Sequence, residues 1–308
     1  MQTKAKVLFV DDEERIVNLL RMMFRSTYEV FTATSGNEAL EIIAANDIQV
    51  IVSDQRMPGM LGTELLSFVR RRSLGTMRIL LTGYSDLAAI VGSVNDGEIF
   101  RFVSKPWSNE EMKAIVGEAA GIALATRDSM PSQLDSVSPP AALAALLVLD
   151  GNNNDRRQIM QLFANGYRVH GAASVADALK VIERHDVGVI VSEARVGSED
   201  TGPLLRILKQ NYPMITTVML TSSADSDLVI KMINQAQIFR FAMKPIRADV
   251  FKLAVSAAMK EHSRFRSNPR MMSRVSVAKS TEPENASLAA RVTASLSRLR
   301  SRFSFFLR

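Results

Sequence analysis

The feature of this sequence that most constrains its fold is an internal repeat with a spacing of 139 residues. The segment VIVSDQRMPG at 50–59 recurs as VIVSEARVGS at 189–198, and IFRFVSKP at 99–106 recurs as IFRFAMKP at 238–245. The register holds from Asp11 to the end of the second of these segments without a net insertion. A unit this long exceeds the roughly 20–50 residues of a solenoid repeat. The chain is therefore predicted to contain two copies of one domain.

Each copy alternates short apolar segments with amphipathic ones. Short segments that are apolar throughout and rich in β-branched residues are typical of parallel strands buried on both faces. Between them lie helical patterns, as at Gly36–Ala45, and Ser108 with Glu111 forms a capping box at a helix start. Strands alternating with helices predict an α/β fold with a doubly wound, five-stranded parallel sheet in each copy. The strands expected in the first copy are KVLFV (6–10), YEVFTA (28–33), QVIVS (49–53), RILLT (78–82) and FRFVS (100–104).

Composition divides the chain further. The first copy is expected over 1–125 and the second over 143–262. Between them 126–142, with RDSMPSQLDSVSPP, has the Pro and Ser content of a linker. The remaining 263–308 has ten Lys and Arg residues against two Glu, whereas the rest of the chain has 28 basic and 30 acidic residues. The overall charge of +6 therefore belongs to a basic tail and not to the folded copies.

The chain has no cysteine, which excludes disulfides and cysteine-bound metals and fits a reducing compartment. Its longest apolar run, AALAALLVL at 141–149, is shorter than the roughly 20 residues that span a bilayer. We therefore expect a soluble, cytoplasmic protein.

Polar residues follow four predicted strands of the first copy. Asp11 and Asp12 follow the first, Asp54 the third, Thr82 the fourth and Lys105 the fifth. In a doubly wound sheet these carboxyl ends form the ligand-binding edge. Three carboxylates repel one another, so a divalent cation is the expected occupant, and oxygen ligands favour Mg²⁺. Each residue alone has a simpler interpretation, such as a helix cap or a turn; together, in this order, they predict a site.

Four motifs of the first copy, FVDDE, SDQRMPGMLG, LLTGY and FVSKPW, resemble those of the receiver domain of two-component response regulators. The resemblance extends to both copies and implies a flavodoxin-like fold for each, in tandem. It implies that Asp54 accepts a phosphoryl group from a histidine kinase or phosphotransfer protein, assisted by Lys105 and Thr82. It further implies Phe102 as the switch residue and a cis bond before Pro106. The implied Mg²⁺ ligands are Asp11, Asp12, Asp54 and the backbone carbonyl of Arg56.

The second copy departs from this pattern at two positions. Asp150, Thr221 and Lys244 keep their types, whereas Gly151 stands where the first copy has Asp12 and Glu193 where it has Asp54. A glutamate near a lysine can satisfy the ammonium without metal or phosphate. We interpret the second copy as a degenerate receiver that has lost phosphoryl transfer. Two explanations of Glu193 stay open, namely imitation of a phosphorylated state and drift in a domain kept for binding.

No pattern in the chain indicates a DNA-binding helix-turn-helix, a cyclic-nucleotide synthase or a phosphohydrolase, and His170, His185 and His262 lack catalytic spacing. We therefore expect no enzyme activity beyond the chemistry of the receiver itself. The output is expected to be binding to a downstream protein or self-association, with the second copy as adaptor.

The alternative output is an adaptor that acts through the basic tail. The segment 287–308 has an apolar stripe at helical spacing, flanked by Arg291, Arg298 and Arg302. Such a helix binds anionic membranes or a partner's groove, and packing against the two copies is the competing interpretation. Nucleic acid fits less well because the arginines do not form a broad basic face. The preceding 266–285 is expected to be a flexible tether. The stripe consists of Leu288, Val292, Leu296, Leu299, Phe303 and Phe306.

Overall fold

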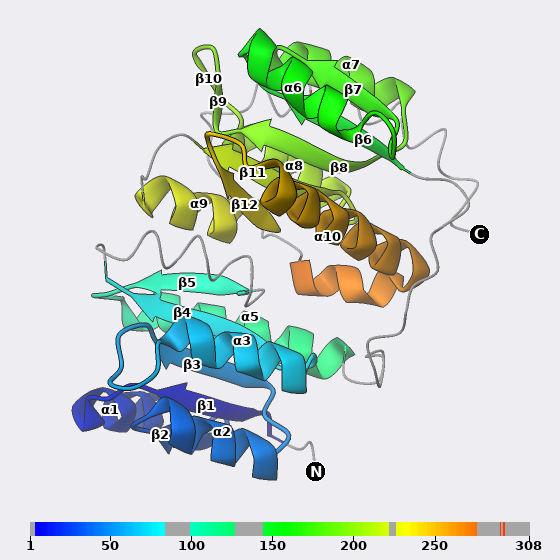
Figure 1. Ribbon diagram of the computed structural model, residues 1–308. Helices are drawn as coiled ribbons and strands as arrows, with labels where there is room; N and C mark the ends of the chain where they lie inside the picture. The colour runs from blue at the N-terminus through cyan, green and yellow to red at the C-terminus, as the bar shows by residue number, and fades with distance from the viewer. Residues whose placement is uncertain are drawn as a thin grey trace. The chain divides into compact units, whose positions relative to one another are not determined.

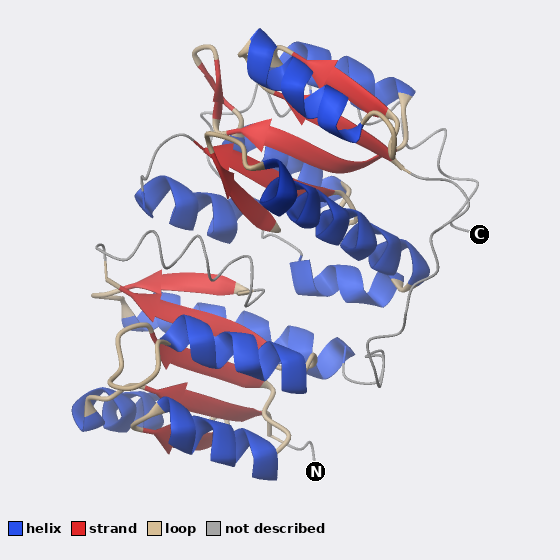
Figure 2. Cartoon of the chain, in the orientation of Figure 1, coloured by secondary structure: helices blue, strands red, loops and turns tan. Residues whose placement is uncertain are grey.

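The structure is a computed structural model that describes residues 4–83, 99–126, 144–221, 226–275, 290 and 292. The chain forms two compact units that largely follow the two repeats (Figure 1). Each unit contains a five-stranded sheet with helices against it, so the α/β fold predicted for both repeats is confirmed (Figure 2).

The first repeat has the doubly wound topology expected for it. The strands lie in the order β2-β1-β3-β4-β5, and all neighbours pair in parallel. Helices α1 and α5 supply side chains to one core with the sheet, while α2 and α3 contact each other and the opposite face. The predicted helix over Gly36–Ala45 is α2, and the Ser108 hydroxyl accepts a hydrogen bond from the Glu111 amide at the start of α5. The elements are β1 (Lys6–Val10), α1 (Glu14–Phe24), β2 (Glu29–Ala33), α2 (Gly36–Ala45), β3 (Val50–Asp54), α3 (Gly62–Arg72), β4 (Met77–Thr82), β5 (Arg101–Ser104) and α5 (Asn109–Thr126).

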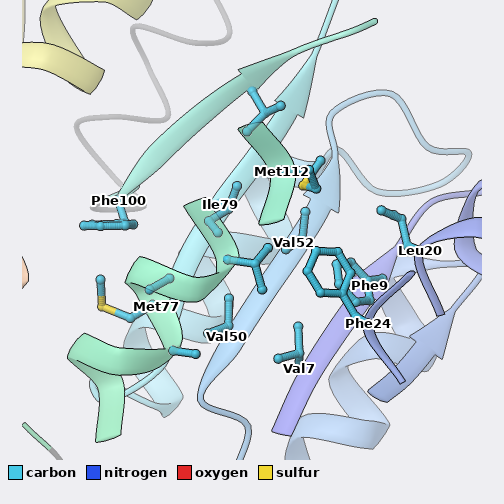
Figure 3. Close-up of a cluster of buried hydrophobic side chains, with 14 of the residues drawn as sticks. Val7, Phe9, Leu20, Phe24, Val50, Val52, Met77, Ile79, Phe100 and Met112 are labelled. Carbon is cyan, nitrogen blue, oxygen red and sulfur yellow. The ribbon is translucent and has the colours of Figure 1, made fainter. Parts of the chain in front are cut away.

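The strands of the first repeat are apolar at most positions because both faces of the sheet are buried. Figure 3 shows Phe9 of β1 beside Phe24 of α1, next to Val50 and Val52 of β3. The ring centroids of Phe9 and Phe24 are 5.1 Å apart. The intervening residues, such as Leu8, are equally buried against the other face. A sheet sandwiched in this way leaves only the strand ends for polar groups, which is where the candidate site lies.

The second repeat has the same strand order, β12-β11-β8-β6-β7, again all parallel. It adds one feature that the sequence did not predict: a short antiparallel hairpin, β9 (Arg195–Val196) and β10 (Glu199–Asp200), between β8 and α8. Gly197 makes its turn with a φ of 63°. The other elements are β6 (Ala145–Leu149), α6 (Asn153–Phe163), β7 (Val169–Ala172), α7 (Val175–Arg184), β8 (Val187–Glu193), α8 (Gly202–Asn211), β11 (Thr216–Thr221), α9 (Ser226–Ala236), β12 (Arg240–Met243) and α10 (Ala248–Ser267).

The second repeat also continues past its predicted end at residue 262. The apolar face of α10 extends to Phe265, which is fully buried, and a 3-10 helix, η2 (Pro269–Val275), follows with Met271 buried. The sequence predicts a tail from residue 263 and a flexible tether from residue 266. Residues 263–275 instead continue the fold of the second repeat, so both predictions are wrong for that segment.

Several predictions fall on residues outside the described ranges. These are the helix between β4 and β5, nearly all of the 126–142 linker, and the tail beyond 275 apart from residues 290 and 292. Of the helices that the structure describes, none has both the length and the apolarity to cross a bilayer.

Candidate functional site

The predicted site residues of the first repeat meet at the carboxyl edge of its sheet. The Lys105 ammonium donates a hydrogen bond to Asp11 Oδ2 at 2.9 Å and also contacts Asp54 Oδ1. Lys105 is placed there by the sheet itself, because its backbone amide donates to the Thr82 carbonyl at 2.9 Å. Residues 94 positions apart in the chain are thus brought together by strand order, as predicted.

Burial sets the electrostatics of this site. Asp11 is 1% and Asp54 6% exposed. Burial raises the pKa of the Asp54 carboxyl, and the opposing effect of Lys105 does not cancel it. For Lys105, burial acts to lower the pKa, but hydrogen bonds to Asp11 and Asp54 outweigh it and raise the pKa. The lysine therefore stays charged, and one ammonium faces two buried carboxylates.

Backbone amides fix the two carboxylates further. The Glu13 amide donates to Asp11 Oδ1 at 3.0 Å, and the Arg56 amide donates to Asp54 Oδ2 at 2.8 Å. Asp12 is exposed. Within the described ranges, no three acidic or imidazole side chains are grouped as ligands of one metal ion. Lys105 instead bridges Asp11 and Asp54.

The donor set nevertheless fits Mg²⁺ in its chemistry. It consists of oxygen atoms alone, and the two buried carboxylates carry more negative charge than Lys105 neutralises. Asp11, Asp12, Asp54 and the Arg56 carbonyl therefore remain the predicted ligands.

The loop after β3 is held tightly against Asp54. A Cβ atom on Gly62 would lie 2.0 Å from the Asp54 carbonyl oxygen, so only glycine fits where α3 begins. The Gly62 amide donates to the Gln55 carbonyl at 3.0 Å. This close approach fixes the backbone that carries the carboxylate.

The remaining predicted residues occupy the expected edge. Thr82 is 1% exposed, and its hydroxyl donates to the Gly83 carbonyl at 3.1 Å. Phe102 is fully buried on β5, beside Leu80 of β4. The side chain that the resemblance implies as the switch residue is thus inside the protein in this structure. The bond between Lys105 and Pro106 is cis, as the resemblance implied.

The second repeat assembles a different site around Lys244. Its ammonium donates to Asp150 at 2.9 Å, to Glu193 at 3.0 Å and to Asp155 at 2.8 Å. Burial acts to lower the pKa of Lys244, but the hydrogen bonds to these carboxylates outweigh it and raise the pKa. Burial raises the pKa of Glu193. The lysine is therefore saturated by carboxylates.

Asp155 was not among the predicted site residues. It corresponds to Ile16 in the repeat register, so the replacement of an apolar residue by an acid was the signal that could have revealed it.

The loops around the second site have also changed. A Cβ atom on Gly151 would lie 3.4 Å from the Gly197 amide nitrogen and 3.5 Å from Val196 Cγ1, so the hairpin borders the position that corresponds to Asp12. Thr201 replaces Gly62, and its hydroxyl donates to the Glu193 carbonyl at 2.7 Å. Thr221, which corresponds to Thr82, is buried at the end of β11.

Comparison with known families identifies both repeats. Residues 7–117 and 146–256 each match the response regulator receiver domain. The chain belongs to this family. The predicted resemblance to tandem receivers is thereby confirmed, and the two repeats are a first and a second receiver domain.

Curated relatives are transcriptional regulators. The hydrogenase transcriptional regulatory protein HoxA of Cupriavidus necator is 37% identical over 116 residues, which is 38% of this chain and 24% of that protein. HoxA of Bradyrhizobium diazoefficiens is 24% identical over 202 residues, which is 66% of this chain and 41% of that protein. The DNA-binding transcriptional regulator NtrC of Klebsiella pneumoniae is 35% identical over 111 residues, or 36% and 24% of the two chains. The chain therefore spans less than half the length of each.

Two solved structures resemble part of the chain. The signal receiver domain of an HD domain-containing protein from Pseudomonas fluorescens has 30% identity and a TM-score of 0.41, covering 42% of this chain and 96% of that one. The response regulator protein TrrA from Thermotoga maritima, solved in complex with Mg²⁺-BeF, has 30% identity and a TM-score of 0.34, covering 37% and 98%.

Proposed function

We propose that the chain is a response regulator of a two-component phosphorelay in which Asp54 is the phosphoacceptor. The observation that carries this proposal is the convergence of Asp11, Asp54 and Lys105 at the carboxyl edge of the first sheet. The donor would be a histidine kinase or a phosphotransfer protein carrying a phosphohistidine. An Asp54 carboxylate oxygen attacks the phosphorus, the phosphorus–nitrogen bond breaks, and the imidazole leaves with its electron pair and takes up a proton.

Each neighbouring side chain has a role in this transfer. Lys105 already contacts Asp54, so its ammonium neutralises charge on the incoming phosphoryl oxygens. Thr82, at the end of the adjacent strand, can turn its hydroxyl from the Gly83 carbonyl, to which it now donates, toward a phosphoryl oxygen. Mg²⁺ held by the predicted ligands would supply further positive charge at the same oxygens.

The switch that we propose links Thr82 to Phe102. Thr82 ends β4, and Phe102 lies on the neighbouring strand β5 two residue pairs earlier. Movement of the Thr82 hydroxyl toward a phosphoryl group would change the space beside Phe102, and so the surface that a downstream protein or a second copy of the chain contacts.

The second receiver would act as an adaptor that is not phosphorylated. Glu193 replaces the phosphoacceptor, Gly151 removes a carboxylate, and Lys244 is already bound by three acids. We propose no catalysis by the chain beyond phosphoryl transfer and hydrolysis of the resulting acyl phosphate. A cytoplasmic location belongs to the same proposal, since the cysteine-free sequence fits that compartment.

Phosphodonor labelling tests the proposal. The full chain is incubated with labelled acetyl phosphate or with a phosphorylated histidine phosphotransfer domain, with and without Mg²⁺. Incorporation should depend on Mg²⁺, disappear in Asp54→Asn and persist in the matched variant Glu193→Gln. Label retained by Asp54→Asn would refute the assignment of Asp54.

A further inference from the structure

A shallow groove between α2 and α3 of the first receiver exposes an aromatic ring. The groove has a volume of about 400 Å³ and is lined by Leu40, Phe68, Arg71 and Arg72. Phe68 is 45% exposed, and the guanidinium carbon of Arg71 lies 4.8 Å from the centroid of its ring. A large aromatic side chain held at a surface in this way is a typical anchor of a protein interface.

Two of the four residues that line the groove are arginines. Helix α3 ends with three consecutive arginines, and neither Arg71 nor Arg72 forms an ion pair within the part of the chain that the structure describes. Basic residues in a last turn also stabilise the helix dipole. That effect does not explain why Phe68, one turn earlier, is left exposed beside them.

The second receiver provides an internal comparison at the same positions. Ile207 replaces Phe68 and is 7% exposed, and Gln210 and Asn211 replace the two arginines. Lys209, on the same helix, turns inward and donates to the carbonyls of Pro213 and Ile215. The corresponding helix of the second receiver, α8, therefore ends without an exposed aromatic ring and without two adjacent arginines. The surface of the first receiver is not a requirement of the fold.

We propose that this groove is a docking site for an acidic segment of a partner protein that carries a large apolar anchor residue. The anchor would pack on Leu40 and Phe68, while carboxylates of the segment bind the guanidinium groups of Arg71 and Arg72. The predicted helix of the chain's own tail does not fit, since its arginines would meet those of α3. Partner docking here is separate from phosphoryl transfer, because α3 contacts the Asp54 backbone at Gly62, about 14 Å along the helix from Arg71.

Selection from a random peptide library displayed on phage, against the unphosphorylated full chain, tests the inference. Selected peptides should be acidic and contain Leu, Phe or Trp. Fluorescence anisotropy should show that Phe68→Ala and the double variant Arg71→Glu/Arg72→Glu each weaken their binding about tenfold or more, and that added salt weakens it further. The matched variant Gln210→Glu/Asn211→Glu in the second receiver should leave binding unchanged.

Three outcomes would overturn the proposal. They are the absence of any enriched peptide, enrichment of basic peptides, and equal loss of binding in the second-receiver control. Binding of phosphatidylserine vesicles through Arg71 and Arg72 in place of peptide would assign the surface to a membrane instead. Because the substituted side chains are exposed, circular dichroism and unchanged Asp54 labelling should verify that each variant is folded.

Discussion

Lys244 donates a hydrogen bond to Asp155 at 2.8 Å, and the matching residue of the first receiver is the uncharged Ile16. The second receiver has therefore not simply lost part of a metal site. It has gained a carboxylate, so that three acids surround one ammonium. Each of the three acids therefore has an ion pair with Lys244, so the ammonium is fully engaged by carboxylates of the protein itself.

The first prediction concerns the stability of this cluster. Lys244→Met removes the cation that pairs with Asp150, whose side chain is fully buried, and leaves three acids facing one another. We expect it to lower the free energy of unfolding of the second receiver by about 3 kcal/mol, because an unpaired buried charge remains. Adding Glu193→Gln should recover part of the loss. A urea midpoint equal to that of the wild type would contradict the prediction.

The second prediction uses the single tryptophan as a reporter of Mg²⁺. The Lys105 ammonium lies 6.0 Å from the centroid of the Trp107 ring, and the chain has no other tryptophan. Mg²⁺ held by the predicted ligands would compete with the ammonium for their carboxylates, so it should change the fluorescence of Trp107 with one saturable transition. Asp54→Asn should weaken or abolish the transition, while Glu193→Gln leaves it intact. A response that is unaltered by Asp54→Asn would place the metal elsewhere.

The sequence was sufficient for the fold and for the first site because both depend on order along the chain. Once a parallel sheet is predicted, residues such as Asp11, Asp54 and Lys105 must meet at its carboxyl edge, and they do. The end of α10 was misplaced because Phe265 and Met271 continue an apolar pattern that the surrounding arginines obscured.

Contacts between side chains of different elements were harder to predict. Asp155 lies in the first turn of its helix, where an acid is ordinary, so only the comparison with Ile16 marks it as unusual. Its contact with Lys244 depends on how the two elements pack, which the sequence does not state. The hairpin over Gly151 is likewise a property of loop geometry, which a repeat alignment does not contain.

The third prediction rebuilds the second site. Restoring the carboxylates with Gly151→Asp and Glu193→Asp should produce measurable Mg²⁺ binding by isothermal titration. The loop after β8 still differs from the loop after β3. The Thr201 hydroxyl donates a hydrogen bond to the Glu193 carbonyl, whereas the first receiver has Gly62 at this position, where only glycine fits. We therefore expect Thr201→Gly, added to the double variant, to tighten Mg²⁺ binding. If the triple variant binds no second equivalent of Mg²⁺, the exclusion comes from features other than these three residues, such as the hairpin beside Gly151 or the Asp155 pair with Lys244.

The fourth prediction concerns two buried bases at the opposite edge of the second receiver. Lys209 donates to the carbonyls of Pro213 and Ile215, and His262 Nδ1 lies 2.8 Å from the intervening carbonyl of Met214. Burial lowers the pKa of Lys209 to about 7, opposed only by Glu261. Burial also lowers the pKa of His262. The other charged groups that influence His262 are Arg266, Asp186 and Lys209 itself.

These shifts determine how stability depends on pH. A base whose pKa is lower in the folded state takes up its proton first in the unfolded state, so acidification favours unfolding. Lys209 causes this loss of stability as the pH falls from 10.5 to about 7, and His262 adds to it below pH 6.5. The second receiver should thus be less stable at pH 7 than at pH 9.

Urea unfolding of the full chain at pH 7, 8 and 9 measures this slope. Trp107 fluorescence reports the first receiver alone, so a circular dichroism transition without a fluorescence change belongs to the second. Lys209→Met should flatten the dependence of the second receiver's free energy of unfolding on pH, because the residue that titrates is gone. The loss of the hydrogen bonds to the Pro213 and Ile215 carbonyls lowers the stability equally at every pH and so does not change the slope. Arg70→Met, at the matching position of the first receiver, should leave that slope unchanged. A slope that survives in Lys209→Met would show that another group controls it.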